Sequence, residues 1–304
     1  MQSNKINVGG QAVIEGVMMR GPEKYVVAAR KKKSIVYKKG NIPSKKNKFL
    51  KMPFVRGFVN LADMMVIGIK SIIWSAQQSG DDDKRLGKNE IAITMIISVG
   101  AVILFFIALP YFLTHLIGIT EEQKPILFNF VDGLIRISIF LIYIYAISFF
   151  SDVKTLFQYH GAEHMTIHCY EKGKKLDAYN VKKFKTLHPR CGTSFLLIVF
   201  IVSIFVFSIL PSLISYYYSN FVNLNVWARK GILFPVRILL IPFVAGISYE
   251  ILKASDKKQN NILFKSISMP GLWLQKITTK KPNSKQIEVA IASLKRLLKI
   301  ERKS

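Results

Sequence analysis

The chain has 304 residues, half of them hydrophobic, and it carries a formal net charge of +26. Apolar and basic residues are segregated into long apolar runs and lysine-rich stretches. This arrangement argues against a water-soluble globular protein and indicates an integral membrane protein. A strongly basic chain can also bind nucleic acid. Membrane orientation explains the charge more simply here, so no nucleic-acid partner is expected.

The N-terminal region, residues 1–89, is expected to be cytoplasmic and to contain a small β element. The sequence YVVAARKKKSIVYK predicts a hairpin with strands at about 25–30 and 34–38. The glycine-rich segment before it, NVGGQAVIEGVMMRGP, does not match a phosphate loop. Two interpretations stay open for this segment. It is either a β element packed on the membrane, or its glycines let the backbone approach a site, with Glu15 as ligand or base.

Residues 54–74 form an apolar segment interrupted by Arg56, Asn60, Asp63 and Lys70. That pattern predicts an amphipathic helix lying at the membrane interface rather than crossing the membrane. Four later runs are more apolar and predict about four transmembrane helices, since ~20 apolar residues suffice to cross the hydrocarbon core. These runs cover residues 91–117, 127–150, 194–218 and 232–251. The predicted fold is therefore mainly α, with a four-span membrane domain at 90–251.

Charged residues also occur within these runs, where they are costly and usually paired. Asp132 and Arg136 lie four residues apart in the second run, and Arg237 lies at a similar depth in the fourth. We predict that Asp132 pairs with one of the two arginines. Prolines in the outer parts of the runs are also compatible with a transport path, which is the lesser hypothesis.

The lysines and arginines predict how the spans are oriented. With four spans, 39 of them fall on the side of both termini and of the connection at 151–193, and three fall on the other side. The positive-inside rule then places the termini and this connection in the cytoplasm. Both cysteines, Cys169 and Cys191, lie in this connection. A reducing compartment disfavours a structural disulfide between them.

The C-terminal region, residues 252–304, is expected to be a basic cytoplasmic tail. Its last part, from residue 284, predicts an amphipathic helix. The apolar stripe of this helix is predicted to lie on anionic inner-leaflet lipids or on the cytoplasmic part of the protein itself. The stripe consists of Ile287, Ala290, Ile291, Leu294 and Leu298.

Three of the five histidines fall within the stretch YHGAEHMTIHCYE, residues 159–171. On a helix, the three histidines and two glutamates of this stretch share an arc of about 140°, whereas a strand would separate the glutamates from the histidines. These five are His160, His164, His168, Glu163 and Glu171. The core is an H-x-x-E-H pattern, which offers two imidazoles to one cation with a carboxylate beside them. Metal binding is the leading hypothesis. A structural or pH-sensing cluster and a solvated polar face are the alternatives.

A second polar cluster, LHPRCGTS at 187–194, precedes the third apolar run. His188 and Cys191 are further candidate zinc ligands, although a tight turn followed by a helix cap at Thr193 or Ser194 explains this cluster equally well. Both clusters adjoin the cytoplasmic ends of predicted spans, so we expect them to converge. Glu250, at the cytoplasmic end of the last run, is either a further ligand or an interfacial carboxylate.

Several segments together resemble the YqhQ-like family of bacterial membrane proteins (domain of unknown function 1385). They are GGQAVIEGVMMRGP at 9–22, YHGAEH at 159–164, HPRCGTSF at 188–195, AGISYE at 245–250 and PGLWLQKITTKKP at 270–282. The resemblance implies a multi-span protein of the bacterial cytoplasmic (inner) membrane and a metal-dependent enzyme, without naming a reaction. Met165 stands where the family pattern has lysine, a position that offers no ligand.

The function predicted from these observations is a membrane protein with a divalent-metal site, most readily zinc, on its cytoplasmic face. It is a candidate metal-dependent hydrolase with the lipid bilayer as its surroundings. A non-catalytic metal sensor, transporter or assembly factor is the alternative. Glu163 is the predicted general base. The predicted ligands are His160, His164, His168, His188 and Cys191, with Glu15, Glu171 and Glu250 as further candidates.

Overall fold

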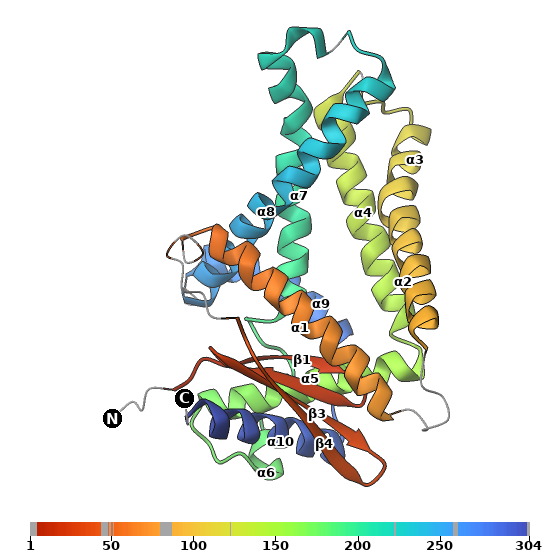
Figure 1. The fold of residues 1–304 in the computed structure, drawn as a ribbon. Helices are drawn as coiled ribbons and strands as arrows, with labels where there is room; N and C mark the ends of the chain where they lie inside the picture. Colours follow the sequence, from red (N-terminus) through yellow and green to blue (C-terminus); the bar gives the residue numbers. More distant parts are fainter. Residues whose placement is uncertain are drawn as a thin grey trace.

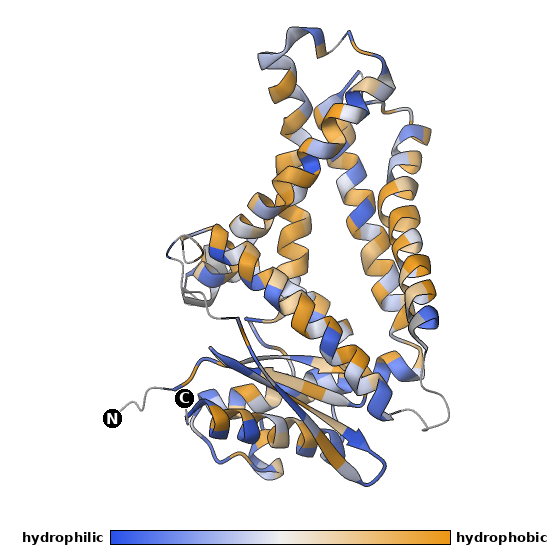
Figure 2. Ribbon diagram, in the orientation of Figure 1, coloured by the Kyte–Doolittle hydropathy of each residue, from blue (hydrophilic) through white to orange (hydrophobic). Residues whose placement is uncertain are grey.

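The computed structural model describes residues 5–43, 48, 50, 52–79, 87–121, 123–221, 223–257 and 261–302. This part of the chain has two layers, a bundle of long helices and a layer of one β-sheet and shorter helices beneath it (Figure 1). Hydrophobic residues dominate the bundle, whereas the sheet layer mixes hydrophobic and hydrophilic residues (Figure 2). The prediction of a mainly helical protein with a small N-terminal β element is confirmed.

The sheet is an antiparallel meander of four strands in sequence order: β1 Gly9–Val13, β2 Gly16–Arg20, β3 Lys24–Lys31 and β4 Ser34–Asn41. The hairpin of β3 and β4 confirms the prediction. The glycine-rich segment forms a second hairpin, whose turn places Glu15 at a φ of 49°. Gly16 lies so close to β3 that a Cβ on it would come within 2.8 Å of the Ala29 Cα. Only glycine fits there without moving the backbone.

The four most apolar runs are helical over nearly all of their length, although the helix of the second run ends at Ile147, before the predicted end at 150. The first is continuous from Lys88 to Leu116 as α2 Lys88–Ile103, the π-helical turn η3 Leu104–Ala108 and α3 Leu109–Leu116. Pro110 follows this turn. Proline has no backbone N–H donor, and the altered hydrogen-bond pattern of a π-helical turn accommodates that loss. The other runs are α4 Pro125–Ile147, α7 Gly192–Tyr217 and α8 Val226–Lys257, with a short 3-10 turn, η4 Ser219–Phe221, after α7.

The segment predicted to be interfacial forms α1, Val55–Ser79, which lies between the sheet and α8 (Figure 1). On its sheet side, Ile67 packs in a small core with Val13, Met18 and Val27. By length and composition alone, α1 is one of five helices in the described residues that are long and apolar enough to cross a membrane. The sequence predicts four crossings, so the fifth candidate is this helix.

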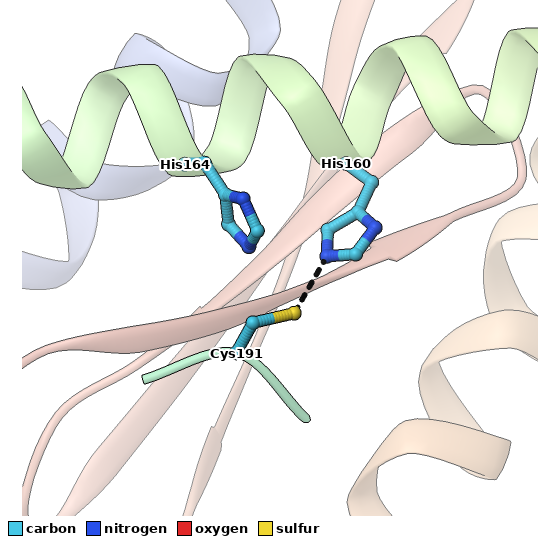
Figure 3. Close-up of side chains that lie close together, drawn as sticks. All are labelled: His160, His164 and Cys191. Atoms are coloured by element: carbon cyan, nitrogen blue, oxygen red, sulfur yellow. Dashed lines mark hydrogen bonds between the residues drawn. The ribbon is translucent and has the colours of Figure 1, made fainter. Parts of the chain in front are cut away.

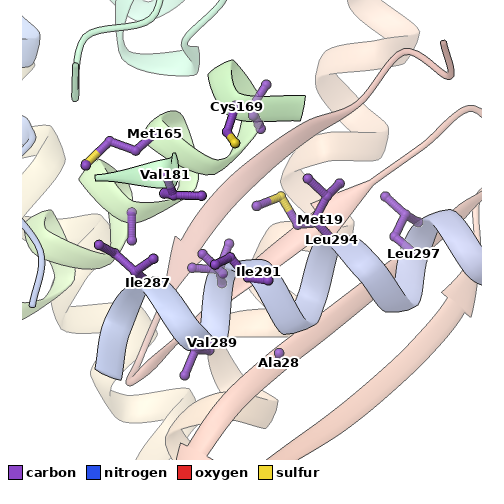
Figure 4. Packing of buried hydrophobic residues seen from close by; sticks show 14 of the residues in the cluster. Met19, Ala28, Met165, Cys169, Val181, Ile287, Val289, Ile291, Leu294 and Leu297 are labelled. Atoms are coloured by element: carbon purple, nitrogen blue, oxygen red, sulfur yellow. The ribbon is translucent and has the colours of Figure 1, made fainter. Parts of the chain in front are cut away.

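The opposite face of the sheet is covered by α5 Ser151–Glu171 and α10 Ser284–Glu301, and the short helix α6 Ala178–Val181 packs on these two helices. All five residues of the predicted apolar stripe of α10 are buried, and they pack against the sheet and α5 (Figure 4). The sequence predicts that this stripe lies either on anionic lipids or on the protein itself. It contacts the protein. One core thus joins segments from the N-terminal region, the connection after the second run and the C-terminal tail. The remaining helix, α9 Ile262–Thr278, packs on α7.

Candidate metal site

The two polar clusters of the sequence lie side by side, one on α5 and the other in the segment that leads into α7. Within the described ranges, their potential ligand atoms form two groups, and the atoms of each group lie within 4.8 Å of one another. The first group is His160, His164 and Cys191, and the second is His168, Glu171 and His188. The helix over 151–171 thus presents its three histidines on one face, as predicted.

Two backbone carbonyls orient the imidazoles of the first group. His160 Nδ1 lies 2.9 Å from the carbonyl oxygen of Thr278, and His164 Nδ1 lies 2.5 Å from that of Thr186. A carbonyl only accepts, so each Nδ1 carries the proton and each Nε2 presents a lone pair. Figure 3 shows both rings turned toward Cys191. Histidines that bind metals are commonly held by such a bond from the other ring nitrogen.

The ligand atoms of the first group lie within 4.8 Å of one another, close enough to share one cation, and the nitrogen–sulfur pair is somewhat closer than a bound zinc ion would hold it. His160 Nε2 is 3.2 Å from Cys191 Sγ. In tetrahedral zinc sites, bonds of ~2.1 Å to nitrogen and ~2.3 Å to sulfur place neighbouring ligand atoms about 3.3–3.6 Å apart. Burial lowers the pKa of His164 well below its ordinary value, which keeps this imidazole in the neutral form that binds metals. The group therefore offers two nitrogens and one sulfur.

Cys191 is the N-cap of α7, a position that the sequence predicts for Thr193 or Ser194. Its sulfur accepts a hydrogen bond from the Thr193 N–H at 3.4 Å and lies 3.0 Å from the Thr193 hydroxyl. Burial raises the pKa of the Cys191 thiol, and the bonds to Thr193 oppose this shift. At neutral pH the sulfur is therefore protonated, and metal binding must release that proton.

Glu163 lies beside the first group and against β1. Its Oε2 is 3.9 Å from His160 Nε2 and 3.7 Å from His164 Nε2. Burial raises the pKa of Glu163 to about 8, although the nearby His160 lowers it. The backbone of β1 passes so close that a Cβ on Gly10 would lie 2.7 Å from Glu163 Cγ. A glycine of the N-terminal motif thus does let the backbone approach the histidine cluster.

Gly10→Ala is expected to displace Glu163 and to lower the free energy of unfolding by about 1–3 kcal/mol, the usual cost of overpacking a buried site. Gly9→Ala is the matched control, because no atom lies within 4 Å of a Cβ on Gly9. Thermal unfolding of both variants in detergent measures the difference. Equal unfolding midpoints would show that β1 does not press on Glu163.

In the second group both ring nitrogens of His188 are engaged in hydrogen bonds, which disfavours a metal ion at that residue. His188 Nδ1 accepts the Arg190 N–H at 3.2 Å, so its Nε2 carries a proton, which faces Glu171 Oε2 at 3.4 Å. Glu171 also forms an ion pair with Arg190. His168 Nε2 donates to a backbone carbonyl at 2.8 Å. Of these predicted ligands, His188 and Glu171 therefore face each other next to the first group, and His168 bonds to the Leu187 carbonyl.

The two other candidate ligands lie outside both groups. Glu15 Oε2 accepts a hydrogen bond from the Tyr159 hydroxyl at 3.2 Å. Glu250 forms a bidentate ion pair with Arg56, with N–O distances of 2.7 and 2.6 Å, which links α8 to α1. Each of these carboxylates is already bonded to a partner outside the two groups of potential ligands, so neither is proposed as a metal ligand.

Two residues of α9 support the site, although their types do not identify them as site residues. The Gln275 side chain accepts the N–H of His188 at 2.8 Å and donates to its carbonyl oxygen at 2.9 Å. Thr278 supplies the carbonyl that orients His160. Both lie in the segment PGLWLQKITTKKP, where a glutamine among apolar residues is the one signal that the sequence offers.

Comparison with known proteins gives two matches. Residues 52–300 match the family described as protein of unknown function (DUF1385). The chain is also 35% identical to the uncharacterized protein YqhQ of Bacillus subtilis (strain 168) over 312 aligned residues, which cover 96% of this chain and 92% of that protein. No solved structure matches.

Proposed function

This chain belongs to the DUF1385 family, and we propose that it is a multi-span membrane protein that holds a divalent metal and acts as a metal-dependent hydrolase. His160, His164 and Cys191 are the proposed ligands. One observation carries the proposal: two imidazoles, His164 buried and His160 half-buried, donate their Nδ1 protons to backbone carbonyls and present Nε2 toward one thiol. Two nitrogens and one sulfur favour zinc over the harder cations that prefer oxygen.

A cation bound by these three residues supplies Lewis acidity to the reaction. Glu163 is the proposed general base, because its carboxyl group lies within 4 Å of both Nε2 atoms. Burial raises its pKa to about 8 in the metal-free protein, and a cation bound beside it would favour the carboxylate that a base requires. At that position it can take a proton from a reacting group and return it to a leaving group, which is the task of the glutamate in H-x-x-E-H enzymes. Two of the proposed ligands, His164 and Cys191, are almost fully shielded from bulk water, and His160 is half-buried.

Glu163→Gln tests this role, because it keeps the shape of the side chain and removes its capacity to take up a proton. We expect the purified variant to retain its metal and to fail to complement a deletion strain. Metabolite and lipid profiles of the deletion strain and of the variant strain should show the same accumulating compound. Loss of metal from the variant would make Glu163 a ligand, and full complementation would rule out a catalytic role.

A non-catalytic role as metal sensor, transporter or assembly factor is the second candidate, and the closure of the site favours it. The exposed fractions are 2% for His164, 4% for Glu163 and 5% for Cys191. If Glu163 is a fourth ligand, protein donors complete the tetrahedral shell, as in structural zinc sites. A chelator should then unfold the sheet layer, whereas a catalytic site should lose activity and keep its fold.

The packing of the sheet layer supports four crossings rather than five. The sheet, α5 and α10 share one core, so they lie on the same side of the membrane. Two crossings separate the sheet from α5 if α1 lies at the interface, and three separate them if α1 also crosses. Two crossings return the chain to the side of the membrane where it began, whereas three leave it on the other side. Only two crossings are therefore compatible with the shared core. We therefore propose that α1 is interfacial and that the crossings are α2–α3, α4, α7 and α8.

The bias of basic residues predicts that the sheet layer is cytoplasmic, in the bacterial inner membrane, with anionic inner-leaflet lipids as partners. Reporter fusions after Lys175 and Lys257 are expected to be cytoplasmic, and a fusion after Glu122 is expected to be external. The measurement is the activity of paired reporters that work on one side of the membrane only. An external Lys175 fusion would overturn the topology and the argument that the cysteines stay reduced.

A further inference from the structure

The half of the bundle far from the sheet, here called the distal half, contains charged groups in an apolar surrounding. On α4, Asp132 forms an ion pair with Arg136 at 2.7 Å. Arg237 on α8 donates to Asn129 at 2.7 Å and to Glu121 at 3.2 Å. Of the two partners predicted for Asp132, Arg136 is therefore the one it contacts. Arg237 and Glu121 still lie within electrostatic range of Asp132, so the five residues form one cluster.

Ser208 on α7 belongs to the same cluster. The helices α4 and α7 run antiparallel, and Gly133 on α4 packs against Ile204 on α7. One turn further from the sheet on both helices lie Asn129 and Ser208. Ser208 is buried, and its neighbour Phe207 lies under the Arg237 guanidinium at 6.0 Å. The distal polar cluster is defined here as Glu121, Asn129, Asp132, Arg136, Ser208 and Arg237.

Four buried polar atoms of this cluster have no hydrogen-bond partner in the described part of the chain. They are Asp132 Oδ1, Arg136 Nε, Ser208 Oγ and Arg237 Nε. Leaving such groups unsatisfied costs ~1–3 kcal/mol each, and more when they are charged. A carboxylate oxygen accepts, a guanidinium N–H donates and a hydroxyl does both. A ligand that satisfies all of them must therefore donate and accept hydrogen bonds.

We propose that the distal polar cluster binds water, so that the distal half of the bundle is a hydrated site reached from the membrane side opposite the histidine cluster. A buried water needs two to four polar partners, which this cluster offers. Its two carboxylates and two guanidinium groups cancel in charge, so a neutral ligand fits better than an anion or a cation. Charged residues inside membrane bundles commonly face such water-filled spaces. The proposal does not depend on metal binding.

Cysteine reactivity tests it, since a thiolate attacks the sulfur of methanethiosulfonate reagents and displaces methanesulfinate, and the thiolate forms only where water reaches the sulfur. Ser208→Cys preserves the size of a buried side chain, 5% exposed in the serine. Ile209→Cys is the matched control at the same depth, on a residue that is 56% exposed on the surface facing lipid. The probe is a membrane-impermeant reagent added to the distal side of proteoliposomes. Peptide mass spectrometry separates these positions from the two native cysteines.

We expect the buried S208C thiol to react at least about 10-fold faster than the exposed I209C thiol. In a bundle without water around the cluster, the order of the two rates would be the opposite, because Ile209 is the more exposed position. Equal or slower reaction of S208C, in a variant that unfolds at the wild-type temperature, would overturn the proposal. If S208C is destabilised, hydroxyl-radical footprinting of the wild type in lipid decides instead. Phe207, beside Arg237, should be oxidised more than Phe205, which is 60% exposed. If Phe207 is oxidised no more than Phe205, the proposal is overturned.

Discussion

His164→Ala is expected to weaken zinc binding by at least about 100-fold. Second-sphere partners alone are worth 10- to 100-fold in metal affinity, and His164 is a proposed first-sphere ligand. Its Nε2 lies opposite the Cys191 sulfur, and its Nδ1 proton is already bound to the Thr186 carbonyl. The alanine variant loses one donor of three, and the two nearby histidines, His168 and His188, belong to the separate second group. Competition titration against a chromophoric chelator measures the affinity.

His115→Ala is the control for this experiment. His115 lies in the last turn of α3, exposed and at the end of the bundle far from the sheet. Its replacement should leave zinc affinity unchanged. Equal losses in both variants would point to a general effect of histidine removal, and no loss in His164→Ala would remove His164 from the site.

Leu294→Ala is expected to lower the free energy of unfolding by about 2–5 kcal/mol, the usual range for a buried leucine. Leu294 is fully buried in the core that joins α10 to the sheet and α5. Lys295→Ala changes the next residue, whose side chain is exposed, and should alter stability by less than about 0.5 kcal/mol. Thermal unfolding in detergent compares the two.

Because α5 shares this core with α10, Leu294→Ala should also weaken zinc binding, although Leu294 is not itself a proposed ligand. Lys295→Ala should not. If Leu294→Ala proves as stable as Lys295→Ala, the C-terminal helix does not seal the sheet layer, and the argument that the sheet, α5 and α10 lie on one side of the membrane fails with it.

Helical periodicity made much of this fold predictable. The H-x-x-E-H stretch and the stripe of α10 each repeat at the helical period, so their faces follow from the sequence. The hairpin of β1 and β2 was not predictable in this way, because its glycines leave few side chains to alternate. In α1, the polar residues are too few to settle between interface and span. What favours the interface is the core that the sheet shares with α5 and α10, a set of contacts that hydropathy does not contain.

The choice among candidate ligands depends on backbone contacts that residue types do not report. His188 and Cys191 are equally plausible ligands by spacing, yet the Arg190 N–H occupies one nitrogen of His188 while Cys191 faces His160. The N-terminal motif contributes through Gly10, whose missing side chain makes room for Glu163. Glu15, the residue of that motif with metal-binding chemistry, points instead to Tyr159.

Zinc K-edge X-ray absorption on protein purified without chelators or metal-affinity tags tests the central claim most directly. We expect about one zinc per chain, with one sulfur at ~2.3 Å and two imidazole nitrogens at ~2.0–2.1 Å. The sulfur contribution should disappear in Cys191→Ser and persist in Cys169→Ser, because Cys169 is buried in the core of the sheet layer. A shell without sulfur in the wild type, or the same sub-stoichiometric metal content in the wild type and His164→Ala, would contradict the proposed site.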